Sequence, residues 1–371
     1  MIRVFEPRLT LSDKFSVLRS VFRNNISGTS PTVADFESDL ADNFERKYAI
    51  AVSNGSTALD LAFQSLDLKK GDEVIVPSFT IISCLSAILR TGATPIFCDV
   101  DKKSWNMTLE KVVSKFSDKT KAVLLVHLYG LAGEAIKIEE FCKNKDIYLI
   151  EDSAEAHGQF VEERPCGSFG DLSTMSFYAN KHVTTGEGGA ILTNNVNFAE
   201  KVKLMRNLGF NNSKRFVHED LYWNYRLGGL QAALGISQIK KLKNTINLKI
   251  KQGKYYQELL KNEGQHLETQ LSNWNGVENH YWVFGVLLKA ENIRDLVIES
   301  LQKKGIETRP FFWPLHLQPA LPEVFKNLEN NLNTSVKLGN DGLYIPIGAH
   351  INSSKQRKIV FELISSIKQF S

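Results

Sequence analysis

The chain is organised around Thr174-Met-Ser-Phe-Tyr-Ala-Asn-Lys181-His-Val-Thr-Thr-Gly-Glu-Gly-Gly189. Its apolar first half predicts a β-strand that delivers Lys181 to a turn, where three glycines leave the backbone unusually free. An amine held at the end of a strand can form an imine with a carbonyl group, which is a form of covalent catalysis. A solvated lysine beside a glycine-rich turn explains the stretch equally well, so the rest of the chain must decide between the two interpretations.

Short apolar runs alternate with segments long enough for helices from residue 48 onward. This alternation predicts βαβ units, and therefore an α/β fold in which helices cover both faces of a largely parallel sheet. Ligands of such sheets bind at the carboxyl ends of the strands. The predicted strands are Ala49–Val52, Val74–Val76, Pro95–Phe97, Ala122–Val126, Tyr148–Ile150, Met175–Tyr178 and Ala190–Leu192.

The flanking sequence predicts a second, smaller domain. A helix over residues 32–44 is expected after an extended start, and a long helical stretch over residues 227–259 is expected to connect the domains. We predict a large domain, residues 1–250, and a smaller C-terminal α+β domain, residues 251–371. The predicted elements of the smaller domain are a strand over His280–Leu288 and helices over Ile293–Lys303 and Ser353–Lys368.

Composition excludes several classes of protein. The 371 residues are 43% hydrophobic and 23% charged, as in folded globular domains, and no apolar run is long enough to span a bilayer. The start of the chain lacks a signal-peptide pattern, so a cytoplasmic location is expected. The net charge of +4, from 45 basic and 41 acidic residues, is too weak to indicate nucleic acid but permits an anionic small molecule.

Cysteine and histidine spacing argues against disulfides and metal. The eight histidines form no cluster with the spacing of metal ligands, so no metal is expected. The cysteines form no Cys-x-x-Cys pair and are interpreted as reduced thiols. They are Cys84, Cys98, Cys142 and Cys166.

A second reactive group follows the predicted strand Tyr148–Ile150. Asp152, in Glu151-Asp-Ser-Ala-Glu-Ala-His-Gly158, could keep a pyridine nitrogen protonated so that the ring acts as an electron sink. Taken alone, Asp152 is more simply interpreted as a helix N-cap. Lys181 and Asp152 together are the two groups that pyridoxal 5′-phosphate requires. The pair therefore predicts this cofactor, with pyridoxamine 5′-phosphate as its aminated form.

A phosphate site is predicted where Val52-Ser-Asn-Gly-Ser-Thr57 follows a strand and begins a helix. Backbone N–H groups and the hydroxyls of Ser56 and Thr57 converge there at the positive end of the helix. Gly55 allows the backbone to approach closely, and Ser176 offers one more hydroxyl. An ordinary helix cap and a strand serine without a ligand are the alternatives.

Motifs along nearly the whole chain resemble the DegT/StrS-type sugar aminotransferases, in order and at the expected spacing. Within that family, Asn180–Gly189 and Ile306–His316 are most similar to the members that convert GDP-4-keto-6-deoxymannose to GDP-perosamine, a sugar of lipopolysaccharide O-antigens. The motifs are Asn54-Gly-Ser-Thr-Ala-Leu, Gly71-Asp-Glu-Val-Ile-Val-Pro, Gly92-Ala-Thr-Pro, Val126-His-Leu-Tyr-Gly130, Glu151–Gly158, Ser176–Lys181, Thr185–Gly189 and Asn224-Tyr-Arg226.

The resemblance implies the fold-type I aminotransferase architecture and a homodimer whose two active sites lie at the subunit interface. It implies transfer of an amino group from L-glutamate to a nucleotide-linked 4-keto sugar. Lys181 resembles the imine lysine and proton shuttle, Asp152 the partner of the ring nitrogen, and Glu155 the residue beside the ring hydroxyl. The implied phosphate ligands are Ser56, Thr57 and Ser176, with Asn224 contributed by the other subunit.

Three further residues are candidates for contact with the nucleotide sugar. Arg226, Arg309 and His316 qualify because an anionic substrate needs donors that are positively charged. Arg226 could instead hold the dimer together, and His316 could be a buried histidine between two prolines.

Two segments depart from the resemblance. Ile81 stands where many relatives place an aromatic ring that stacks on the cofactor, which predicts an aliphatic stacking surface and weaker cofactor retention. The loop Leu131–Ile136 also differs from the usual sequence.

The resemblance leaves other functions open. A dTDP- or UDP-linked keto sugar with a 3- or 4-amino product is one alternative, and a non-catalytic regulator on the same scaffold is another. Lys181 and Asp152 argue against the regulator. The related dehydratases carry histidine at the position of Lys181, so lysine also argues against that reaction.

Overall fold

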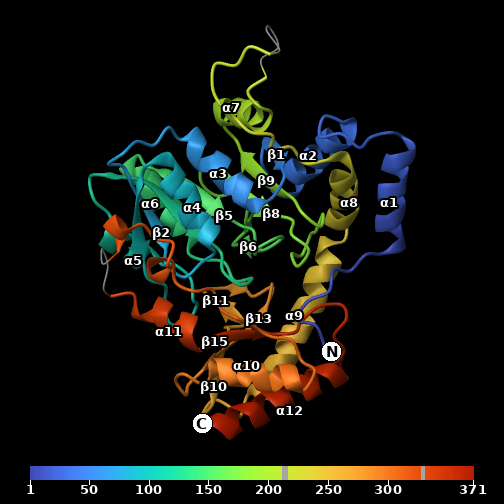
Figure 1. The fold of residues 1–371 in the computed structure, drawn as a ribbon, viewed down its shortest axis with the longest axis vertical. Helices are drawn as coiled ribbons and strands as arrows, with labels where there is room; N and C mark the ends of the chain where they lie inside the picture. The colour runs from blue at the N-terminus through green and yellow to red at the C-terminus, as the bar shows by residue number, and fades with distance from the viewer. Residues whose placement is uncertain (211–215, 327–330) are drawn as a thin grey trace.

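The computed structural model describes residues 1–210, 216–326 and 331–371. A large domain built on a seven-stranded sheet lies above a smaller domain built on a four-stranded sheet (Figure 1). Helix α9 (Leu242–Leu260) runs from one domain into the other. The predicted α/β architecture with a smaller C-terminal domain is confirmed.

The central sheet has the strand order β1-β9-β8-β5-β4-β2-β3. The neighbours from β8 to β3 pair in parallel, whereas β9 is antiparallel to both β8 and β1. The sheet is therefore largely parallel, as predicted. Its strands are β1 (Tyr48–Val52), β2 (Glu73–Pro77), β3 (Thr94–Cys98), β4 (Thr120–Val126), β5 (Tyr148–Asp152), β8 (Leu172–Ser176) and β9 (Gly189–Thr193).

Helices cover both faces of this sheet because consecutive strand residues point to opposite sides. In β4, Leu124 packs into the cluster formed with α3, α4 and α7, whereas Leu125 packs into the cluster formed with α5 and α6. A third cluster joins α2 and α8 to β1. The helices are α2 (Pro31–Asn43), α3 (Gly55–Ser65), α4 (Ile82–Thr91), α5 (Leu109–Lys115), α6 (Ala135–Lys145), α7 (Val196–Arg206) and α8 (Gly229–Ile239).

The small domain has its own apolar core between its sheet, in the order β10-β13-β15-β14, and its helices. The N-terminus belongs with this domain, since Ile2 accepts a hydrogen bond from the backbone N–H of Glu307 at 2.9 Å. The elements are β10 (Leu267–Thr269), β13 (Phe284–Leu288), β14 (Arg309–Pro310), β15 (Gly342–Ile345), α10 (Arg294–Lys303), α11 (Asn333–Asp341) and α12 (Ser353–Phe370).

The structure differs from the predicted elements at three places. The strand expected over His280–Leu288 begins only at Phe284, as β13. The start of the chain, expected to be extended, contains helix α1 (Leu11–Phe22), which packs on α8. The helical stretch over residues 227–259 is two helices, α8 and α9, which are separated at Lys240 and Lys241. The predicted domain division at residue 250 stays a prediction, and it falls inside α9.

The remaining strands form two short hairpins, β6 (Phe160–Val161) with β7 (Arg164–Pro165) and β11 (Asn273–Trp274) with β12 (Val277–Glu278). Within the described residues, none of the helices has both the length and the apolar character needed to cross a membrane.

Candidate active site

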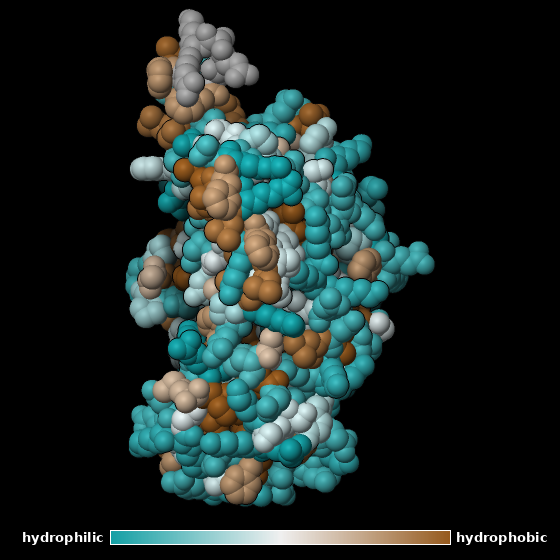
Figure 2. Space-filling model, turned by 90° about the vertical axis from the view of Figure 1, so that its right-hand side faces the viewer, coloured by the Kyte–Doolittle hydropathy of each residue, from teal (hydrophilic) through white to brown (hydrophobic). Residues whose placement is uncertain are grey.

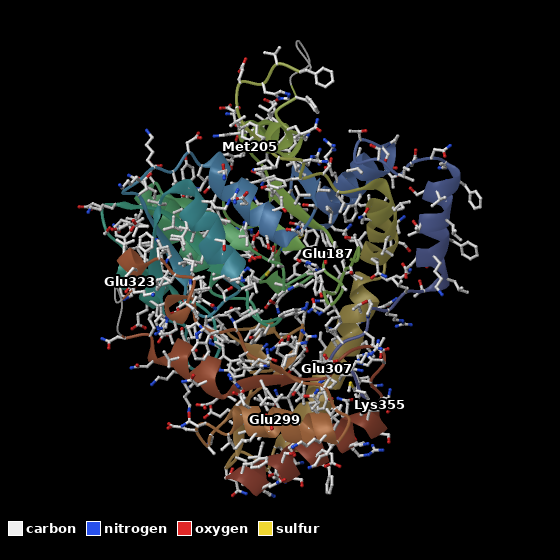
Figure 3. All side chains as sticks on the ribbon, viewed as in Figure 1. Glu187, Met205, Glu299, Glu307, Glu323 and Lys355 are labelled. Carbon is white, nitrogen blue, oxygen red and sulfur yellow. The ribbon has the colours of Figure 1, made fainter. Side chains whose placement is uncertain are left out.

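A cavity of about 560 Å³, called the main cavity below, lies where the carboxyl ends of the strands face the small domain. Residues of both domains line it, and Figure 3 labels one of them, Glu187 of the large domain. The residues on its wall include Asn54, Gly55, Ser56, Ile81, Ser83, Asp152, Glu155, Ser176, Tyr178, Lys181, Glu187, Trp282, Phe312 and Tyr344.

Asp152 is the last residue of β5, and its side chain is buried at the wall of this cavity. Its Oδ1 accepts a hydrogen bond from the backbone N–H of Ala154 at 3.1 Å, and Cys84 Sγ donates to Oδ2 at 3.7 Å. Burial raises the pKa of Asp152, against the opposing effects of Ala154 and Lys181. No helix begins at Asp152, so it is not a helix N-cap, and a cationic ligand in the cavity would offset the cost of its burial.

Lys181 follows β8 by five residues and lies in a turn, so it is not at the strand end itself. Its Nζ lies 3.4 Å from Glu155 Oε1 and 3.7 Å from the centre of the Trp282 ring, which contributes a cation–π contact. Burial lowers the pKa of Lys181, and the charges of Glu155 and Asp152 oppose this shift. A buried lysine with a lowered pKa has more of the neutral amine that attacks carbonyl groups.

Glu155 links Lys181 to the loop after β4. Its Oε2 accepts a hydrogen bond from the backbone N–H of Tyr129 at 2.9 Å. Burial raises the pKa of Glu155 to about 7, with the charge of Lys181 acting in the opposite direction. Burial therefore moves the pKa values of Lys181 and Glu155 towards each other.

The predicted phosphate site lies at the start of α3. Asn54 caps this helix by accepting a hydrogen bond from the backbone N–H of Thr57 at 2.8 Å. A Cβ atom added to Gly55 would lie 2.8 Å from Ser176 Cβ, so only glycine lets the backbone pass this closely. Ser56 Oγ lies 2.7 Å from Ser83 Oγ, and both serines line the cavity. The arrangement offers hydroxyls and a positive helix end to an anion.

Thr57 occupies a different position from Ser56. Its Oγ1 donates a hydrogen bond to Asn54 Oδ1 at 2.8 Å, and it does not line the main cavity. Ile81, by contrast, does lie on the cavity wall with 41% of its surface exposed. The role of Thr57 as a phosphate ligand and the role of Ile81 as the stacking surface for the cofactor stay predictions.

The other four predicted residues lie outside the main cavity of this chain. His316 Nδ1 lies 2.6 Å from Ser78 Oγ, and Arg309 pairs with Glu307 at 3.2 Å. Arg226 contacts Asn207 Oδ1 through its guanidinium group, and its backbone N–H donates to Asn224 Oδ1 at 3.3 Å. The roles of Asn224, Arg226, Arg309 and His316 stay predictions. Asn224 was expected to serve the other subunit.

Sequence reasoning missed the small-domain wall of the cavity. Trp282, Phe312 and Tyr344 come from three separate segments, and the fold brings them opposite Lys181. Trp282 is 5% exposed, and its indole N–H donates to the backbone oxygen of Asn180 at 3.2 Å. The adjacent aromatic residues Tyr281 and Trp282 indicate a buried segment. The sequence does not indicate that this segment lies beside Lys181.

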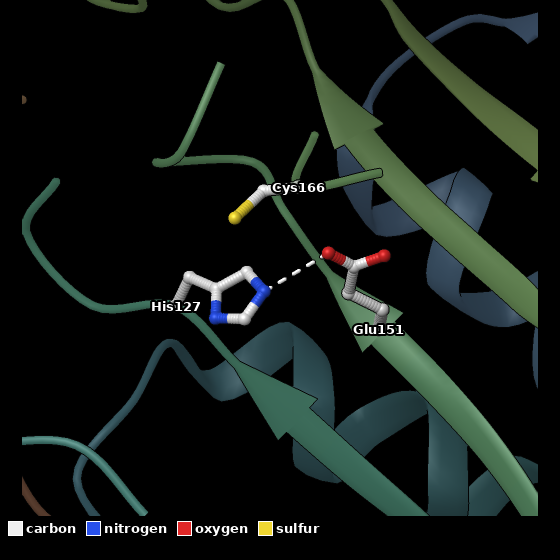
Figure 4. A group of neighbouring side chains, drawn as sticks. All are labelled: His127, Glu151 and Cys166. Carbon is white, nitrogen blue, oxygen red and sulfur yellow. Dashed lines mark hydrogen bonds and ion pairs between the residues drawn. The ribbon is translucent and has the colours of Figure 1, made fainter. Parts of the chain in front are cut away.

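His127, Glu151 and Cys166 form a buried cluster at the carboxyl end of β5, the strand to which Glu151 belongs (Figure 4). Glu151 accepts hydrogen bonds from His127 Nε2 at 2.9 Å, from Ser173 Oγ at 2.6 Å and from two backbone N–H groups. His127 Nδ1 accepts from the backbone N–H of Gly133 at 3.1 Å. Because Glu151 and His127 are satisfied by protein donors, we interpret the cluster as structural support for β5.

The residues present fit pyridoxal 5′-phosphate. Asp152 is a buried carboxylate for which the described residues provide no ion pair, Lys181 is a buried amine on the same wall, and Gly55 leaves room beside Ser176. The fold and the site together define a pyridoxal-phosphate-dependent aminotransferase of fold type I.

The chain belongs to the DegT/DnrJ/EryC1/StrS aminotransferase family, whose model matches residues 11–364. It is 35% identical to the GDP-perosamine synthase of Escherichia coli O157:H7 over 326 residues, covering 88% of each chain. It is 29% identical to the putative pyridoxal phosphate-dependent aminotransferase EpsN of Bacillus subtilis, covering 94% and 91%.

A solved aminotransferase from Psychrobacter cryohalolentis has the same fold. It superposes with a TM-score of 0.90, at 27% identity and with 98% of each chain covered. The chain is therefore a sugar aminotransferase that depends on pyridoxal phosphate, as the sequence motifs predicted.

Proposed function

We propose that the protein transfers the amino group of L-glutamate to a nucleotide-linked 4-keto-6-deoxysugar, with GDP-4-keto-6-deoxymannose as acceptor and GDP-perosamine as product. The observation that carries the proposal is that Asp152, at the end of β5, and Lys181, in the turn after β8, line one cavity. Relatives named GDP-perosamine synthases, at 33 to 35% identity, support the choice of acceptor.

Ser56, Ser176 and the N-terminus of α3 would hold the cofactor phosphate, and Asp152 would lie at the ring nitrogen. When bound, pyridoxal phosphate supplies a ring that takes up the electron pair left behind by a departing α-proton. Asp152 would keep a proton on the ring nitrogen, because the buried carboxylate is stabilised by a neighbouring positive charge.

Lys181 performs the proton transfer in both half-reactions. Its amine would take the proton from the α-carbon of glutamate and deliver it to the C4′ carbon of the cofactor, and it would move a proton in the opposite direction when the keto sugar is the substrate. Glu155, 3.4 Å away, would orient the amine and stabilise its charged form between the two transfers. Trp282, Phe312 and Tyr344 exclude water from this step.

A dTDP- or UDP-linked keto sugar is the second candidate acceptor. Relatives at 34% identity are named as dTDP-sugar aminotransferases that act at either the 4- or the 3-position, so overall identity does not separate the nucleotides. A relative at 30% identity is named a pleiotropic regulatory protein. The buried pair of Lys181 and Asp152 favours catalysis over a purely regulatory role.

The remaining expectations belong to this proposal. The exposed apolar face of α1, formed by Leu11, Phe15, Leu18 and Phe22, supports association into a homodimer. Figure 2 looks onto the side of the molecule where α1 lies and shows apolar groups scattered among polar ones. The cytoplasmic location and the link to O-antigen synthesis stay predictions.

The decisive experiment is a product assay. The purified protein is incubated with glutamate and a panel of GDP-, dTDP- and UDP-linked 4-keto-6-deoxysugars, and product masses are followed. We expect an amino sugar from the GDP-linked substrate. If only a dTDP- or UDP-linked sugar is aminated, the acceptor is the second candidate and not the GDP-linked sugar. The absence of any amino sugar would refute the proposed reaction.

A further inference from the structure

A second cavity of about 330 Å³ adjoins Lys181 and is called the rear cavity below. It lies between the N-terminal segment, the turn that carries Lys181, the first half of α9 and the loop Ile347–Ala349. Asn180 and Lys181 line both the rear cavity and the main cavity, so the reactive amine stands at their common wall.

The two cavities carry opposite charge. The main cavity has three acids against one basic residue, whereas the rear cavity has four basic residues against one acid and therefore attracts a carboxylate. The charged residues are Asp152, Glu155, Glu187 and Lys181 in the main cavity, and Arg8, Lys181, Lys241, Lys249 and Glu6 in the rear cavity.

Lys249 is the unusual member of the rear cavity. It is 7% exposed, and among the residues that the structure describes its Nζ donates one hydrogen bond, to the backbone oxygen of Trp282 at 2.7 Å. Lys241 differs, because its Nζ lies 2.6 Å from Asp13 Oδ1. Burial, followed by the charge of Lys181, lowers the pKa of Lys249 to about 7. A buried ammonium group without a carboxylate is costly unless a ligand supplies one.

We propose that the rear cavity is the subsite for the amino donor, and that Lys249 binds its side-chain carboxylate. The α-carbon of the donor must lie at Lys181, on the common wall, so the far carboxylate of a five-carbon dicarboxylate extends into the rear cavity. The nucleotide sugar remains in the main cavity. The inference rests on the proposed function for the identity of the donor as glutamate.

The first test measures binding without turnover. Glutarate, a dicarboxylate that cannot donate an amino group, is titrated calorimetrically into the holoenzyme and into Lys249→Met, which keeps the length of the side chain but removes its charge. We expect the Kd for glutarate to rise about tenfold or more, since a buried charge-assisted hydrogen bond is lost. Lys249→Arg should bind glutarate to within about threefold of wild type.

Matched controls separate this subsite from other anion effects. Lys251 lies exposed on the same helix, and Lys251→Met should leave the Kd for glutarate unchanged. The Kd for GDP should be equal in wild type and Lys249→Met. Unchanged glutarate binding in Lys249→Met would overturn the proposal, as would a loss of GDP affinity of the same size, which would assign the cavity to a phosphate.

A second test uses the choice of donor. The change in cofactor absorption is followed with L-glutamate and with L-alanine, which lacks the second carboxylate. Lys249→Met should raise the glutamate concentration for half-maximal conversion about tenfold and leave that for alanine unchanged. Equal effects on both donors would overturn the subsite. Wild-type protein that binds glutarate but aminates no sugar would refute the proposed acceptor and leave the subsite standing.

Discussion

The two walls of the main cavity differ in composition and in origin. The large-domain wall carries the charged and hydroxyl residues, such as Asp152, Ser56 and Ser176, beside apolar ones, whereas the small-domain wall consists of Trp282, Phe312 and Tyr344. In the proposed mechanism, the first wall supplies the groups that bind and transfer protons. The second wall excludes water in that mechanism, and its Trp282 contacts the amine, so this wall would control how strongly the charged groups interact.

Lys181→Ala should cause the largest effect, because it removes the reactive amine from the large-domain wall, called the polar wall below; the small-domain wall is called the aromatic wall. Steady-state transamination should fall to below about one thousandth of the wild-type rate. Circular dichroism should show an intact fold, and the cofactor should still bind. Appreciable turnover by this variant would refute the assignment of Lys181, and Lys251→Ala, on an exposed position, is the control.

Asp152→Asn should rank second. The amide keeps the shape of the side chain but does not hold a proton on the ring nitrogen, so we expect kcat to fall roughly a hundredfold. The measurement is the rate of each half-reaction with saturating cofactor. A wild-type rate would mean that the carboxylate is a structural residue and not the partner of the ring.

Glu155→Gln should change stability in a pH-dependent way in the cofactor-free protein. Burial raises the pKa of Glu155 to about 7, so its stabilising protonated form is lost as the pH rises through 7, while the unfolded carboxyl ionises near its usual value of 4.5. The side chain of the Glu155→Gln variant does not ionise, so this variant does not lose stability in that pH range. Its melting temperature relative to wild type should therefore increase between pH 5 and pH 8, and a constant difference would contradict the burial argument.

Trp282→Phe should have the smallest effect, because it retains an aromatic wall. It weakens the contact with the amine and removes one hydrogen bond, from the indole N–H to the backbone oxygen of Asn180. The ring lies 3.7 Å from Lys181 Nζ and favours the charged form. The acidic limb of the pH–rate profile should move to lower pH by less than about one unit. Tyr344→Phe, on the same wall, should leave that limb in place; an equal shift in both variants would assign the effect to general packing.

The polar wall was predictable because its residues follow strands whose apolar runs are visible in the sequence. Asp152 and Ser176 end β5 and β8, and parallel strands bring such ends to one edge. The aromatic wall was not predictable, because Trp282, Phe312 and Tyr344 meet only after the small domain packs against the large one.

Helix α1 was wrongly predicted as extended, although the sequence contained its signals. Leu11, Phe15, Leu18 and Phe22 recur at helical spacing, and Thr10 with Asp13 forms a capping box. These apolar residues are exposed in the described chain, so the usual expectation of a buried apolar stripe does not apply to them.

The central claim is that Lys181, and no other lysine, carries the cofactor. Reduction of the purified holoenzyme with borohydride fixes the cofactor to the amine that holds it, and peptide mass spectrometry then locates the modified residue. We predict the label on Lys181. A label on Lys249, which lines the neighbouring rear cavity, or on any other lysine would contradict the account.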